Sequence, residues 1–182
     1  MKPLMYIFGQ PGSGKSTLVR TLTQGQTCLD GRQGGLPVIS YYPAEVLEIG
    51  VERPDFRGTD ALSMTIINTA CRVLPDINDT CVLAEGDRLA VQRFLAAAAR
   101  SFRLELVYLD TPDEVAAERR VQRAIDLNKE PQSGTWVKGR ISKARRLYDA
   151  WGGLVLDGAR TPRELADTLM ERTEVGGCFA TG

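Results

Sequence analysis

A glycine-rich segment near the N-terminus has the spacing of a phosphate-binding loop. The segment GQPGSGKS, residues 9–16, fills every fixed position of the pattern G-x-x-x-x-G-K-[ST]. The apolar run Leu4–Phe8 precedes it and predicts a buried strand, and the residues from Ser16 onward predict a helix. Backbone N–H groups of such a loop and the positive end of the helix converge on one anion. The predicted phosphate ligands are Gly9, Pro11, Gly12, Ser13, Gly14, Lys15, Ser16 and Thr17.

Two side chains at the end of this loop would take part in the chemistry. The Lys15 ammonium group would reach the β- and γ-phosphates of a nucleoside triphosphate, and the Ser16 hydroxyl would hold Mg²⁺. The pattern therefore predicts a site for a nucleoside triphosphate with its magnesium ion, and it makes Lys15 a candidate catalytic residue. A glycine-rich turn that binds nothing is the alternative interpretation.

The segment AEGDR, residues 84–88, places charged side chains at the end of another short apolar run. Ligands of a parallel sheet bind at the carboxyl ends of the strands, so these side chains should lie near the phosphate-binding loop. Glu85 or Asp87 would reach Mg²⁺ directly or through a water molecule, and Asp87 is also a candidate catalytic residue. A helix-capping role is the alternative for Asp87. Arg88 would neutralise a phosphate or pair with an acid.

A basic segment covers about residues 119–146, with nine Lys or Arg residues against two acids, Asp126 and Glu130. Arg119 and Arg123 are four residues apart, so they lie on one face of a predicted helix and can contact the same phosphates. Arg140, with Lys138 as a further candidate, would fold over the donor when a lid closes and excludes water. A solvated basic helix face is the alternative. Arg160, after the last predicted strand, is a further candidate nucleotide contact.

The acceptor of the phosphoryl group is expected to bind in the region of about residues 38–68. A hydroxyl acceptor needs a carboxylate to take its proton. The candidates are Asp55 and Asp60, with Asp30 as a third, and each of the three could equally be a turn or cap residue. Flat faces for a base and positive charges for a phosphate are also found there, in Tyr41, Tyr42, Phe56, Arg53 and Arg57.

The composition of the chain indicates one globular domain of 182 residues, with 43% apolar and 25% charged residues. Lys plus Arg and Asp plus Glu are both 23, which argues against a surface coated for nucleic acid but not against a local basic patch. The lack of histidine argues against a zinc site and a histidine base. The four cysteines form no C-x-x-C pair, and neither a membrane-spanning run nor a signal peptide is visible. We therefore expect a cytoplasmic protein without a membrane partner, located in the host cytoplasm if it is viral.

Strands alternate with helices along most of the chain, which predicts a parallel sheet covered on both faces. Residues 23–37 look turn-rich, and residues 38–50 suggest a short strand followed by helical spacing. Helical periodicity runs over Asp60–Leu74 with Asp60 as a candidate N-cap, and from Pro112 to about Asn128. Helical spacing resumes at Ile141 and again after Thr161, and the tail from residue 174 looks frayed.

Three segments resemble the P-loop nucleoside and nucleotide kinases, thymidylate kinases in particular. They are the phosphate-binding loop, AEGDR at a strand end, and LDTPDEVAAERRVQR, residues 109–123. Together with LDGARTPREL, residues 156–165, they cover most of the chain. The resemblance implies a three-layer α/β/α fold over residues 1–182 with a five-stranded parallel sheet, a helical lid between the fourth and fifth strands, and ATP with Mg²⁺ as donor.

Three shorter segments look like small phage-type P-loop kinases: RPDFRGTDALSM, AEGDRL and TWVKGR. Part of that group phosphorylates the 5-hydroxymethyl group of 5-hydroxymethyluracil in DNA, a step in thymidine hypermodification. The first functional hypothesis is therefore a kinase of this modified DNA, whose basic lid would meet the DNA backbone. A kinase of free deoxynucleoside monophosphates is the alternative, and a non-catalytic nucleotide-binding module is a more remote one. A homodimer is a further candidate assembly.

The sequence argues against a GTPase. Guanine recognition needs the pattern N-K-x-D, and the nearest match, NKEP at residues 128–131, has proline in place of the aspartate.

Overall fold

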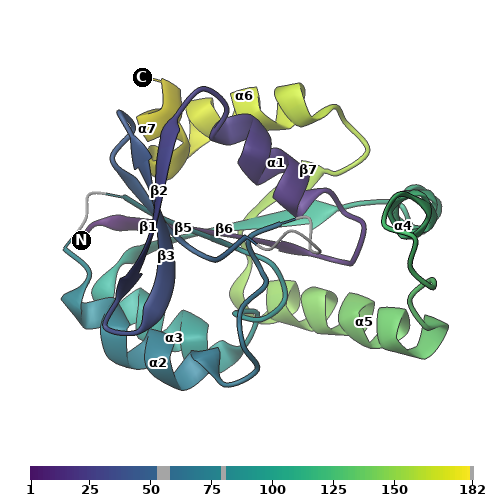
Figure 1. The fold of residues 1–182 in the computed structure, drawn as a ribbon, viewed down its shortest axis with the longest axis horizontal. Coiled ribbons are helices and arrows are strands. Elements are labelled where there is room, and N and C mark those ends of the chain that lie inside the picture. The colour runs from purple at the N-terminus through teal and green to yellow at the C-terminus, as the bar shows by residue number, and fades with distance from the viewer. Residues whose placement is uncertain (53–57, 79–80, 181–182) are drawn as a thin grey trace.

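A central sheet of seven strands organises the part of the chain that this computed structural model describes, residues 1–52, 58–78 and 81–180 (Figure 1). Across the sheet the strands are β2 (Thr27–Gln33), β3 (Leu36–Tyr42), β4 (Val46–Ile49), β5 (Cys81–Glu85), β1 (Pro3–Gly9), β6 (Arg103–Asp110) and β7 (Leu154–Asp157). Helices cover both faces, so the α/β class and the three layers predicted from the sequence are confirmed.

Five strands, from β4 to β7 in sheet order, run parallel to one another. Their carboxyl ends lie at one edge of the sheet, where Gly9 pairs with Leu109 and Asp110 pairs with Asp157. The segments that follow β1, β5, β6 and β7 are therefore brought together, as the alternation of strands and helices predicted.

The prediction of a five-stranded sheet is wrong by two strands, because β2 and β3 extend it in the antiparallel direction. Gly34 and Gly35, both with positive φ, form the two-residue turn between them. Neither strand was predicted as such over its full length. Most of β2 is exposed to solvent as an edge strand, so its sequence TCLDGRQ lacks the apolar alternation by which strands are found. The segment with helical spacing after β3 is the strand β4.

The seven α-helices in the described residues are α1 (Lys15–Leu22), α2 (Ile66–Val73), α3 (Gln92–Ser101), α4 (Asp113–Asp126), α5 (Gly134–Trp151), α6 (Pro162–Arg172) and α7 (Glu174–Ala180). A short 3₁₀ helix, η1 (Leu74–Asp76), follows α2. Figure 1 shows α1, α6 and α7 on one face of the sheet and α2, α3 and α5 on the other, with α4 at the side. Each face buries its own apolar cluster, built around Leu4 and Phe94 on one side and Leu18 and Leu83 on the other.

Three helix boundaries differ from the sequence prediction. The helix α2 begins at Ile66, so Asp60 is not its N-cap. The helix α5 already begins at Gly134, because the Ser133 side chain accepts a hydrogen bond from the Trp136 backbone N–H and caps it. The predicted frayed tail forms α7, where Val175 and Phe179 are buried. These contacts are tertiary, and the glycine-rich sequence of the tail does not indicate them.

Candidate active site at the phosphate-binding loop

The phosphate-binding loop has the backbone that its glycines predicted. Gly12 and Gly14 have φ angles of 86° and 99°, which residues with side chains rarely adopt. Gly14 is the N-cap of α1, so the first helical residue is Lys15. The Lys15 Nζ donates to the carbonyl oxygens of Gly9 and Gln10 at 3.1 and 2.9 Å and to the Ser13 hydroxyl at 3.2 Å. The loop is thus curled around the ammonium group.

The electrostatic setting of Lys15 combines burial with nearby acids. Burial lowers the pKa of the ammonium group, and the negative charges of Glu85, Asp60 and Asp87 oppose this shift. Lys15 and these three acids line one cavity.

Two arginines of α4 hold the loop from outside. The Arg119 guanidinium donates to the carbonyl oxygens of Gly158 at 2.8 Å and Ser13 at 3.4 Å, and Arg120 donates to the Pro11 carbonyl oxygen at 2.7 Å. A side chain on Gly12 would overlap the Ala116 backbone, so the glycine also permits this close approach of α4. Arg120 was not predicted, although it lies in the same basic segment next to Arg119.

A cavity of about 270 Å³ lies beside the loop on the side of α6. Its lining includes the backbone of Gly158, the side chains of Arg119, Arg123 and Arg160, and Thr17 of α1. Arg119 and Arg123 therefore share one side of α4, as their spacing predicted. Arg160 also forms an ion pair with Glu164 at 2.9 Å, within the capping box that begins α6.

The Glu85 carboxylate, at the end of β5, faces the start of α1. The Ser16 hydroxyl donates to Glu85 Oε1 at 2.7 Å, and the side chain is only 1% exposed. Glu85 Oε2 is also buried and has no hydrogen-bond partner among the described residues. A buried carboxylate oxygen without a donor, next to a hydroxyl, fits the oxygen ligands that Mg²⁺ takes in sites completed by phosphates and water. These residues could hold the metal.

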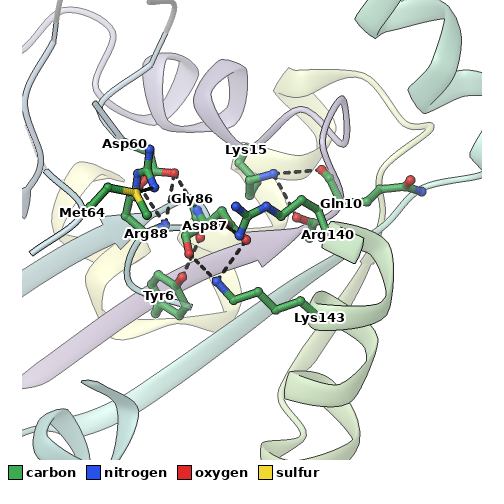
Figure 2. A network of polar contacts seen from close by, with 11 residues as sticks. Tyr6, Gln10, Lys15, Asp60, Met64, Gly86, Asp87, Arg88, Arg140 and Lys143 are labelled. Atoms are coloured by element: carbon green, nitrogen blue, oxygen red, sulfur yellow. Dashed lines mark hydrogen bonds and ion pairs between the residues drawn. The ribbon is translucent and has the colours of Figure 1, made fainter. Parts of the chain in front are cut away.

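The Asp60 carboxylate lies over the turn that follows β5 (Figure 2). Its Oδ2 accepts a hydrogen bond from the Asp87 backbone N–H at 2.6 Å, and its Oδ1 accepts one from the Arg88 backbone N–H at 3.1 Å. Gly86, with a φ of 98°, has no room for a side chain because the Asp60 carboxylate occupies that space. Burial raises the pKa of Asp60 to about 7, although the two backbone hydrogen bonds lower it.

The Asp87 carboxylate is held by two cations of α5, as Figure 2 shows. Arg140 donates to Asp87 Oδ2 at 2.5 Å, and Lys143 Nζ lies 3.2 Å from Oδ1 and 2.8 Å from the Asp87 carbonyl oxygen. The Arg140 guanidinium also lies over the Trp136 ring, 5.2 Å from its centroid. Of these, Lys143 and Trp136 were not predicted as site residues. Trp136 lies in the first turn of α5, and no motif distinguishes it.

A second cavity, of about 350 Å³, unites these groups. It is lined by the predicted residues Gly9, Pro11, Gly12, Gly14, Lys15, Ser16, Thr17, Asp60, Glu85, Asp87, Arg88, Arg123 and Arg140. Gln132 and Trp136 line it as well. The topology thus brings together residues that are far apart in the sequence.

Some predicted residues do not join this cavity. Asp55, like Arg53, Phe56 and Arg57, lies outside the described residues. Tyr41 is buried, with 7% exposure, and packs edge-on against Phe179, so its ring has no face for a base. Asp30 is on the exposed edge strand β2. Lys138 lines a separate groove between α4 and α5.

Two features of the described residues bear on metals and membranes. No group of three or more Cys, Asp or Glu side chains there could by itself enclose a metal ion. Within the same ranges, no helix has the length and apolar character needed to cross a membrane.

Comparisons with known structures agree with this fold. An unliganded sugar kinase from Janibacter sp. HTCC2649 is 15% identical, with a TM-score of 0.59 over 100% of both chains. A shikimate kinase from Aquifex aeolicus vf5 is 15% identical, with a TM-score of 0.53 over 98% of this chain and 99% of that one. The shikimate kinase of Acinetobacter baumannii in complex with shikimate is 20% identical, with a TM-score of 0.55 over 94% and 92%. At these identities the likeness shows the fold.

The family is shown by the sequence itself. No curated protein matches the chain. The family model described as P-loop Nucleotide Kinase3 matches residues 1–170, which is most of the chain. The protein is therefore a phosphotransferase that belongs to this family of P-loop nucleotide kinases.

Proposed function

We propose that this protein transfers the γ-phosphoryl group of ATP to a hydroxyl group of a small molecule, with Mg²⁺ as its metal and Asp60 as the base. The observation that carries the proposal is that the phosphate-binding loop and the Asp60 carboxylate line the same cavity. A hydroxyl acceptor must lose a proton, whereas a phosphate acceptor is already ionised at neutral pH, so a carboxylate at this place favours a hydroxyl.

The donor would bind across both cavities. Its phosphates would lie in the loop, with Lys15 at the β- and γ-phosphates. Its base would enter the cavity between Arg119 and the Gly158 backbone, which is apolar enough near Leu18 and Pro162 to accept a ring. Mg²⁺ would be held by Ser16 and Glu85, and when bound it neutralises charge on the phosphates.

Asp60 is better suited than Asp87 to be the base. The Asp87 carboxylate is already paired with Arg140 and Lys143, so both of its oxygens are engaged. The pKa of Asp60, raised to about 7 by burial, lies near neutral pH, where a general base is most effective. The acceptor oxygen would attack the γ-phosphorus, the bond to the β,γ-bridging oxygen would break, ADP would leave, and the hydroxyl proton would pass to Asp60.

The remaining cations would act on the phosphoryl group as it moves. Arg88 lines the cavity, where its guanidinium contacts the Met64 sulfur. Arg140 and Arg123 line the cavity from the lid side. Phosphoryl transfer depends on positioning and charge stabilisation, which such cations supply.

The class of acceptor is supported by chemistry and by analogy of fold. The similar structures are named for a sugar and for shikimate, which are small hydroxylated molecules. The 5-hydroxymethyl group of 5-hydroxymethyluracil in DNA is also a hydroxyl acceptor, and a free deoxynucleoside monophosphate is a phosphate acceptor. The Asp60 carboxylate would serve the hydroxyl of the first, whereas the second needs no base, so both belong in the experiment as separate acceptors.

The test uses γ-labelled ATP, Mg²⁺ and four acceptor pools: monosaccharides, shikimate, the common deoxynucleoside monophosphates, and DNA with or without 5-hydroxymethyluracil. We expect label on a hydroxyl group, at a rate that falls about 10²- to 10⁴-fold in Asp60→Asn. Asp149→Asn, an exposed change on α5, is the matched control and should keep the wild-type rate. Transfer to the phosphate of a monophosphate, undiminished in Asp60→Asn, would contradict the proposal. Binding of ATP without transfer to any pool would favour a nucleotide-binding module.

A further inference from the structure

A second carboxylate is buried behind the candidate active site, on the neighbouring strand. Glu48 of β4 has no exposed surface and lines neither cavity. It pairs in register with Leu83 of β5, two residues before Glu85, so both carboxylates lie on the α1 face of the sheet. Burying a carboxylate in a strand lowers the stability of the fold unless the carboxylate is hydrogen-bonded. The proposed phosphoryl transfer does not use Glu48 directly.

Both oxygens of Glu48 have a donor. The Tyr41 hydroxyl donates to Oε2 at 2.7 Å, and the Thr59 hydroxyl makes a short contact with Oε1. Burial raises the pKa of Glu48 to about 7, and these two hydrogen bonds act in the opposite direction. The carboxylate is thus fixed from two sides, by β3 and by the segment that leads to Asp60.

Thr59 connects Glu48 with the phosphate-binding loop. Its backbone N–H and its hydroxyl oxygen both lie 3.4 Å from Glu85 Oε1, the same atom to which Ser16 donates at 2.7 Å. A continuous chain of polar contacts therefore runs from Glu48 through Thr59 and Glu85 to Ser16.

The Thr59 hydroxyl has a single proton, so it can serve only one carboxylate at a time. Its contact with Glu48 is much shorter than its contact with Glu85, so Glu48 determines the orientation of the Thr59 side chain. The Thr59 backbone is held as well, because its carbonyl oxygen accepts from the Val51 N–H at 2.8 Å. A Cβ on Gly50 would lie 2.7 Å from the Thr59 Cβ, so this close packing requires glycine at position 50.

We propose that Glu48 is a positioning residue which, through Thr59, determines where the carboxylates of Glu85 and Asp60 lie relative to the phosphate-binding loop. Thr59 touches Glu85 directly and precedes Asp60 in the chain, so a displaced Thr59 moves both acids. The inference rests on the proposed function, because it assigns Glu48 to the site that would hold Mg²⁺ and the acceptor.

The test compares two pairs of variants. Glu48→Leu removes both acceptor oxygens, whereas Glu48→Gln keeps one for Thr59 or Tyr41. Thr59→Val removes the hydroxyl with little change of shape, whereas Thr59→Ser keeps it. The readouts are the affinity for Mn²⁺, followed by electron paramagnetic resonance in the presence of a non-hydrolysable ATP analogue, thermal unfolding, and kcat and KM for ATP.

We expect Glu48→Leu and Thr59→Val to weaken Mn²⁺ binding and to lower kcat about tenfold, with little change in the KM for ATP. Glu48→Gln and Thr59→Ser should stay within about threefold of wild type. Glu105→Gln is the matched control, since Glu105 is a partly buried carboxylate that accepts from the Glu174 and Val175 N–H groups on α7. It should lower thermal stability and leave Mn²⁺ affinity unchanged.

The outcomes separate this inference from the proposed function. Wild-type Mn²⁺ affinity and kcat in folded Thr59→Val overturn the role of Glu48, even if Glu48→Leu does not fold, while transfer activity itself stands. Equal loss in Glu48→Gln and Glu48→Leu also overturns it, because the conservative variant would then fail to rescue. If the wild-type protein binds no Mn²⁺ with the nucleotide analogue, both the inference and the proposed function fail.

Discussion

Asp60→Asn should make the protein less active but more stable at high pH relative to wild type. The Asp60 carboxyl has a pKa of about 7 in the folded protein, against an ordinary value of 3.8. The folded state therefore holds the proton where the unfolded chain has already lost it. Between pH 3.8 and about pH 7 the folded state binds more protons than the unfolded chain. The contribution of Asp60 to the free energy of unfolding therefore falls as the pH rises.

The size of this effect follows from the two pKa values. A difference of about three in pKa corresponds to about 4 kcal/mol, at 1.36 kcal/mol for each unit. Asp60 keeps some contact with solvent, which screens its charge, so we expect about 2 to 3 kcal/mol. Asparagine does not titrate and removes this part of the pH dependence. It also loses part of the hydrogen bonding to the Asp87 and Arg88 N–H groups, which costs about 1 kcal/mol at every pH.

The assay is urea unfolding of wild type and Asp60→Asn at several pH values from 4 to 8, without nucleotide or metal. The free energy of unfolding of the variant, relative to wild type, should rise by about 2 to 3 kcal/mol from pH 4 to pH 8. Glu48 also has a raised pKa, but it is present in both proteins and its contribution cancels. A constant difference between the two proteins across this range would refute the raised pKa of the Asp60 carboxyl.

Three further changes test the loop, the turn and the lid. Lys15→Ala should leave the fold intact and abolish transfer, because it removes roughly several kcal/mol of charge stabilisation at the transition state. Near-normal kcat in the folded variant would exclude the loop as the donor site. Gly86→Ala should lower the free energy of unfolding by about 1 to 3 kcal/mol in urea titrations, because its positive φ and the Asp60 carboxylate both oppose a side chain. Arg140→Ala should lower kcat about tenfold or more. Its Tm should change by only about a few degrees, because the ion pair with Asp87 is partly exposed. A collapse of Tm without loss of kcat would instead make Arg140 a structural residue.

The elements that could be predicted from sequence are those with a strong local signal. The loop at residues 9–16 was found because its glycines and the Lys-Ser pair have a fixed spacing. The helix α6 was found because Thr161 as a cap and Pro162 at the first helical position form a start signal. The hairpin of β2 and β3 was missed because an exposed edge strand has no apolar alternation. The helix α7 was missed because its stability comes from packing Val175 and Phe179 against the sheet.

The sequence by itself determined the phosphate-binding loop and the order of strands and helices that brings charged strand ends to one edge of the sheet. These depend on local spacing, which a sequence displays directly. Only the tertiary structure decided what each charged side chain does. Asp60 is not the cap of α2, because α2 begins six residues later and the Asp60 carboxylate instead accepts from the backbone after β5. Glu48 had no signal in the sequence, since its partners, Tyr41 and Thr59, come from segments on either side of it that meet only when the sheet forms.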